Sequence, residues 1–195
     1  MYKNNLPPHT VIEHITVTVY GGNFMEQNVS KSVRYYLIAG LIFTAILGTL
    51  SHFFYEWSGE NRVIALFSPV NESTWEHMKL VFFPVLLWSL FMPPAIRKAY
   101  PSLRPALLAG NLIGTFLITV LFYTYSGVLG RNVSFIDIAI FFIAVAAVFY
   151  TARKLESSDR IYRMQKLIAA LTILLALAFF LFTFLPPDIG LFREP

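Results

Sequence analysis

The chain has 195 residues, of which 56% are hydrophobic, 16% are aromatic and only 13% are charged, and its formal net charge is +4. Soluble domains carry about twice this charged fraction, so the composition excludes an ordinary soluble domain. The absence of cysteine excludes disulfides and thiolate metal sites. The positive charge does not indicate nucleic-acid binding, because most of the basic residues lie in alternate segments between apolar runs.

Residues 1–30 differ from the rest and are predicted to form a cytoplasmic tail. Within them, residues 14–20 alternate apolar and polar side chains and precede Gly21 and Gly22, which predicts a short strand and a turn. A lone strand is not stable by itself, so we expect residues 1–24 to be a mobile tail or the native start to be Met25. The first 30 residues contain no apolar segment typical of a cleavable signal peptide.

Residues 31–195 are predicted to form one all-α domain, a bundle of five transmembrane helices. A helix rises about 1.5 Å per residue, so roughly 20 residues cross the hydrocarbon of a bilayer. The long uncharged runs approach this length, whereas a core helix of a soluble protein would show a polar stripe. The predicted helices are residues 35–56, 74–97, 104–127, 134–153 and 165–185.

The basic residues predict how these helices are oriented. Cytoplasmic loops of membrane proteins carry an excess of lysine and arginine. Here the basic residues collect before the first helix, between the second and third, and between the fourth and fifth: Lys3, Lys31, Arg34, Arg97, Lys98, Arg104, Arg153, Lys154, Arg160, Arg163 and Lys166. The N-terminus is therefore predicted to be cytoplasmic and, after five crossings, the C-terminus extracytoplasmic.

Small residues predict which helix faces pack closely. Residues without bulk at steps of four form ridges that let neighbouring helices approach. The ridges are Gly40, Thr44 and Gly48 in the first helix, and Ala106, Gly110 and Gly114 in the third. Pro84 predicts a kink in the second helix, because proline lacks the N–H that would bond the carbonyl one turn earlier. Asn111 is predicted to hydrogen-bond to a neighbouring helix.

Acidic residues and histidines concentrate in residues 51–79, at the predicted outer ends of the first two helices and in the loop between them. A charged side chain at membrane depth costs about 3 kcal/mol on insertion scales, so it persists where it pairs, faces water or binds a ligand. We predict that an extracytoplasmic ligand site is formed by His52, Glu56, Asn71, Glu72, Glu76 and His77.

The residue types in this stretch suit more than one kind of chemistry. His52 and Glu56 are four residues apart and share a helix face. An imidazole beside a carboxylate binds Zn²⁺ or another divalent cation, or acts as an acid–base pair, and the structural alternative is an interhelical hydrogen bond. The candidate metal ligands are His52, Glu56, Glu76 and His77.

Helix capping is the structural alternative for two of the acidic residues. Ser73 followed by Glu76 fits a capping box, which stabilises a helix start. Ser134 followed by Asp137 fits the same pattern at the start of the fourth helix. Capping does not explain Glu72 equally well, and the free N–H groups of a helix start also attract anionic groups.

One stretch carries a resemblance to a known family. Residues 68–77, Ser-Pro-Val-Asn-Glu-Ser-Thr-Trp-Glu-His, with residues 48–60 before them, resemble a family of uncharacterised small bacterial multi-pass membrane proteins, a domain of unknown function. The resemblance extends from about Arg34 to the C-terminal end and does not include residues 1–24. It implies a location in the bacterial inner membrane and brings no known activity.

Three functions are compatible with these features. The first is binding or transport of a cation or small polar solute, and a five-helix transporter is expected to be a homo-oligomer. The second is a non-catalytic scaffold or accessory subunit whose polar residues only lock helices together. The third is a metal-dependent hydrolase acting on lipid, in which His52, His77 and carboxylates hold the metal and another glutamate activates water. The lipid bilayer is the expected partner in all three.

Overall fold

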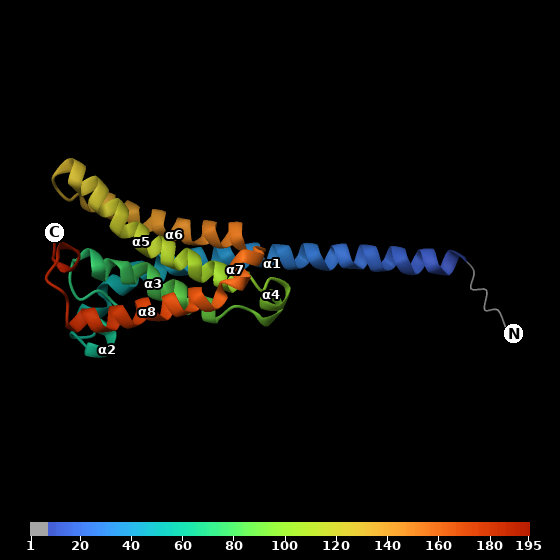
Figure 1. Ribbon diagram of the computed structural model, residues 1–195, viewed down its shortest axis with the longest axis horizontal. Coiled ribbons are helices and arrows are strands. Elements are labelled where there is room, and N and C mark those ends of the chain that lie inside the picture. The colour runs from blue at the N-terminus through green and yellow to red at the C-terminus, as the bar shows by residue number, and fades with distance from the viewer. Residues whose placement is uncertain (1–7) are drawn as a thin grey trace.

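The computed structural model describes residues 8–195, and their side chains from residue 30 onward. The regular structure in this part of the chain is helical, which confirms the predicted all-α class. The elements are α1 (Pro8–Trp57), α2 (Arg62–Ala65), α3 (Thr74–Leu90), α4 (Pro94–Ala99), α5 (Leu103–Leu129), α6 (Ser134–Leu155), α7 (Asp159–Arg163), α8 (Gln165–Phe184) and the 3₁₀ turn η1 (Gly190–Phe192). Figure 1 shows that the first part of α1 extends beyond the bundle formed by the other long helices.

Four helices of the described residues are long and apolar enough to cross a bilayer, so the protein is a multi-pass membrane protein. They are Ser30–Trp57, Leu103–Leu129, Ser134–Leu155 and Gln165–Phe184. The fifth long helix, α3, has 17 residues, which corresponds to about 25 Å and is shorter than the roughly 30 Å hydrocarbon core. It packs against α1, α5, α6 and α8, and eleven of its 17 residues are buried, so α3 is the central helix.

Two predicted elements differ from the structure. The helix predicted over residues 74–97 ends at Leu90, and α4 starts separately at Pro94. Pro93 and Pro94 are the reason, because two successive prolines supply no N–H to continue the helix. The strand predicted over residues 14–20 is wrong, because these residues belong to α1. A helix satisfies its backbone hydrogen bonds within one segment, whereas a lone strand has no partner.

The long helices alternate in direction (Figure 1). The two ends of the bundle differ in the segments and side chains that they hold. One end holds α2, the start of α3 and the C-terminal turn η1. The other holds α4 and α7, which contain Arg97, Lys98, Arg160 and Arg163. We call these the polar end and the basic end.

The small-residue ridge of α1 lies against α3 and α6. A Cβ at Gly48 would be 2.4 Å from the backbone oxygen of Leu80 and 2.7 Å from the Phe141 ring. Leu80 is the residue whose carbonyl Pro84 cannot bond, since it lies four residues earlier in α3. Gly48 therefore lets α1 pack directly on the part of α3 that the proline alters.

The second ridge brings α5 and α6 together. A Cβ at Gly110 would be 2.5 Å from the backbone oxygen of Val148, so only glycine allows this approach of the two backbones. Between the glycines, the Nδ2 of Asn111 donates a hydrogen bond of 3.1 Å to the carbonyl of Phe82 in α3. The predicted interhelical role of Asn111 is confirmed, and its bond joins α5 to the central helix.

We predict that Gly48→Ala destabilises the bundle, by about 1–3 kcal/mol, because the added methyl group overpacks a contact with rigid backbone. Thermal unfolding of the detergent-purified protein measures this effect. The control is Gly127→Ala, where a Cβ has no neighbour within 4 Å and alanine favours a helix interior by up to about 1 kcal/mol. Equal melting temperatures of the two variants would contradict the packing account.

Candidate functional site

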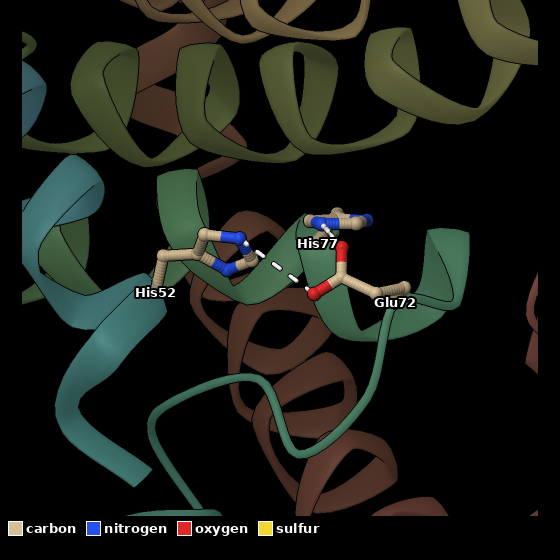
Figure 2. A group of neighbouring side chains, drawn as sticks. All are labelled: His52, Glu72 and His77. Carbon is tan, nitrogen blue, oxygen red and sulfur yellow. Dashed lines mark ion pairs between the residues drawn. The ribbon is translucent and has the colours of Figure 1, made fainter. Parts of the chain in front are cut away.

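Three of the predicted site residues meet at the polar end of the bundle (Figure 2). His52 comes from α1, Glu72 from the loop before α3, and His77 from the first turns of α3. The Nε2 of His77 is 3.2 Å from the Oε2 of Glu72, and the Nε2 of His52 is 3.7 Å from its Oε1. One ligand atom from each residue lies within 4.8 Å of the others. We call this group the His–Glu–His cluster.

The start of α3 fixes where Glu72 and His77 stand. Ser73 is the N-cap, and its Oγ accepts the N–H of Glu76 at 3.4 Å. The Oδ1 of Asn71 accepts the N–H of Ser73 at 3.0 Å, which holds the turn just before the helix. Side chains at helix starts satisfy N–H groups that have no partner within the helix. These bonds orient the backbone on both sides of Glu72, so its carboxylate lies between the two imidazoles.

The cluster lines a cavity of about 450 Å³ between α1, α3, α5 and α6. The cavity wall is mostly apolar, with residues such as Leu80, Ile118 and Phe141. The side chains of His52 and His77 are 32% and 30% exposed, and that of Glu72 is 63% exposed. The three side chains are therefore partly exposed without any opening of the bundle.

Asp137 also lines this cavity, although the sequence did not identify it as a site residue. The predicted cap formed by Ser134 and Asp137 is wrong, because α6 has Val133 as its N-cap and no side-chain capping bond. Asp137 instead accepts a hydrogen bond from the hydroxyl of Tyr125. The position of Asp137 at the predicted outer start of a helix was the one sign in the sequence that it belongs to the site. The capping pattern gave a different explanation for this position.

Glu76 serves a different purpose from the cluster. Its Oε2 lies 2.6 Å from the Nζ of Lys79, and the two side chains are 3% and 0% exposed. The Nζ of Lys79 also donates to the hydroxyl of Thr183 in α8 at 2.6 Å and to the carbonyl of Ala65 at 2.9 Å. The same Glu76 oxygen accepts the N–H of Val70 at 3.0 Å. This buried pair therefore ties α3 to α8 and to the loop after α2.

The six predicted residues thus separate into two sets. His52, Glu72 and His77 come together, whereas Glu56, Asn71 and Glu76 do not join them. Glu56 is exposed, one turn beyond His52 near the end of α1. Asn71 bonds within its own turn and Glu76 is held by Lys79. Of the four candidate metal ligands, only the two histidines lie in the cluster.

Comparison with known proteins places most of the chain in one family. Residues 25–195 match a family of unknown function (DUF6512). No curated protein sequence matches the chain, and no solved structure matches it. The matched region contains every residue of the His–Glu–His cluster and the buried pair.

We predict that Lys79→Met destabilises the protein by about 3–5 kcal/mol, because it leaves the Glu76 carboxylate buried without its cation. The double variant Lys79→Met/Glu76→Leu should recover much of this loss, since no unpaired charge remains. Arg193→Met is the control: it breaks the exposed pair with Asp188 and should cost only about 0–1 kcal/mol. Unfolding curves in detergent compare the three proteins, and a double variant no more stable than Lys79→Met would contradict the account.

Proposed function

We propose that this chain, which belongs to a family of unknown function (DUF6512), is a membrane protein that binds a divalent transition-metal cation such as Zn²⁺ through His52, Glu72 and His77. The observation that carries the proposal is the convergence of two imidazole nitrogens and one carboxylate oxygen within 4.8 Å. These atoms come from one helix, the loop after α2 and the start of α3, so the chain brings them together only on folding.

The spacing of the cluster suits such a cation. Zn²⁺ binds nitrogen and oxygen ligands at about 2.0–2.2 Å, so two ligands of a tetrahedral site are roughly 3.4 Å apart. The Nε2 of His77 is 3.2 Å from one Glu72 oxygen, and the Nε2 of His52 is 3.7 Å from the other. One ligand atom from each residue lies within 4.8 Å of the others, so binding would draw the three side chains closer together. Imidazole is a ligand for zinc and its neighbours in the periodic table, whereas magnesium and calcium prefer oxygen alone.

A catalytic role is the second candidate, and Asp137 favours it. A metal with three protein ligands keeps one position open for water or a substrate. Asp137 lines the same cavity as the cluster, where its carboxylate, which accepts a hydrogen bond from Tyr125, would serve as a general base for water activated by a metal. The apolar remainder of the cavity suits a lipid-derived substrate, so this candidate is a metal-dependent hydrolase acting at the membrane.

The distribution of charge supports one orientation of the bundle in the membrane. We propose that all five long helices cross the membrane, with α3 included because the other four surround it. The basic end then faces the cytoplasm, in agreement with the positive-inside rule, and the C-terminus and the His–Glu–His cluster face outward. In the bacterial inner membrane, the cluster would meet cations on the extracytoplasmic side. A transport function would require a homo-oligomer, because five helices enclose only a narrow pathway.

We predict that the chelator-treated protein binds one Zn²⁺ per chain, measured by calorimetric titration in detergent. His77→Ala or Glu72→Gln should weaken binding by more than the 10–100-fold that is typical when a residue that only hydrogen-bonds to a metal ligand is changed, because each removes a direct ligand. Affinity should also fall as the pH is lowered from neutral, since imidazole and carboxylate bind metal only when they are deprotonated.

The matched control is Glu56→Gln, which removes a nearby carboxylate outside the cluster and should leave zinc affinity unchanged. Binding that persists in His77→Ala at its original strength would reject the site. If the chain binds no zinc while Glu72→Gln lowers only the melting temperature, the cluster is a structural lock and the scaffold function is favoured.

A further inference from the structure

A groove lies between α1 and α6 at the basic end of the bundle. The His–Glu–His cluster lies at the opposite, polar end. The volume of the groove is about 440 Å³. Arg34 of α1 and Arg153 of α6 lie at one end of it, and Leu41 and Ala146 line the other end, nearer the bundle centre. We infer that this groove binds the phosphate headgroup and part of an acyl chain of an anionic phospholipid.

The two helices contribute to the groove in the same pattern. On α1 the lining runs from Arg34 to Leu41, and on α6 it runs from Arg153 back to Ala146. Each path is seven residues, or about 10 Å along a helix axis. The helices α1 and α6 run in opposite directions (Figure 1). Arg153 lies two residues before the end of α6, which leads to α7 at the basic end, and Arg34 lines the same groove. The lining of both helices therefore continues from an arginine toward the bundle centre. A charged mouth above an apolar groove matches the amphiphilic form of a phospholipid.

The groove is open to the surroundings of the bundle. The side chains of Ile38 and Tyr150 on its edge are 46% and 65% exposed. Beneath them, Leu37 and Phe149 are buried and form its floor. In a membrane protein these exposed edges face lipid, so a lipid chain enters from the side without passing through the protein.

The charges at the mouth favour an anionic headgroup. Arg34 makes no ion pair among the described residues, and Arg153 pairs with Glu156 through one of its nitrogens. A guanidinium carries five N–H donors, so Arg153 retains donors for phosphate oxygens. The Nζ of Lys154 lies 5.5 Å from the centre of the Tyr150 ring, which brings a third cation beside the groove. Basic pockets between transmembrane helices are typical sites for anionic headgroups.

This inference does not depend on the metal site, because the two sites share no residue. A second copy of this chain is a poorer occupant. In a symmetric contact between the α1–α6 faces of two copies, Arg34 and Arg153 of one copy would lie against the same two arginines of the other. Like charges at close range repel.

Native mass spectrometry of the delipidated protein tests the inference with phosphatidylglycerol and with phosphatidylcholine of identical acyl chains. We predict that phosphatidylglycerol binds at least about tenfold more tightly, since each arginine near an anionic headgroup contributes roughly fivefold. The double variant Arg34→Gln/Arg153→Gln should lose this preference. The control Arg62→Gln/Arg131→Gln removes the same charge at the polar end and should keep it.

The apolar part of the groove has its own test. Ala146→Phe fills the groove from an exposed position while both arginines remain, and it should weaken phosphatidylglycerol binding. Glycerol phosphate, the headgroup without chains, should bind far more weakly than the lipid. Equal binding of the two lipids, an unchanged preference in Arg34→Gln/Arg153→Gln, or glycerol phosphate binding as strong as the lipid would each overturn the inference. A dimer that closes the groove and excludes lipid would also overturn it.

Discussion

The buried ion pair of Lys79 and Glu76 is the interaction on which the polar end of the bundle depends. Both charges lie inside the protein, where loss of hydration is costly unless every donor and acceptor finds a partner. Lys79 meets this condition with Glu76, Thr183 and the carbonyl of Ala65. Glu76 in turn accepts the N–H of Val70, in the loop after α2. The pair therefore connects α2 and this loop to α3 and α8, so the chain segment that carries Glu72 has a defined position.

Close packing of α1 on α3 positions His52, the cluster residue that comes from α1. His52 belongs to α1, and its distance from His77 depends on how near α1 lies to α3. Gly48, one turn before His52, allows the α1 backbone to contact the Leu80 carbonyl. The two imidazole ring centres are consequently 5.4 Å apart. One ridge of small residues, of the kind that membrane helices use for packing, thus sets the spacing of the proposed metal ligands.

The sequence was sufficient to predict the helical class, the small-residue contacts and the stretch that contains the cluster, because periodicity, apolar length and residue size are local properties. It was not sufficient to separate Glu72 from Glu76, since both precede or begin the same helix. The two glutamates differ because Lys79, which pairs with Glu76, also donates a hydrogen bond to Thr183, 104 residues away in the chain. Asp137 was missed for a related reason: its tertiary partner, Tyr125, belongs to the preceding helix, and the capping pattern gave a local explanation that the structure does not support.

The two ends of the bundle therefore have different proposed ligands, a cation at the polar end and a phospholipid at the basic end. In the proposed site, folding places two imidazoles and one carboxylate around a single cation. X-ray absorption at the zinc edge, on protein loaded with one equivalent of Zn²⁺, measures these ligands. We expect nitrogen and oxygen ligands at about 2.0–2.2 Å with the multiple scattering of two imidazoles, reduced to one in His52→Ala. A spectrum without imidazole scattering would contradict it.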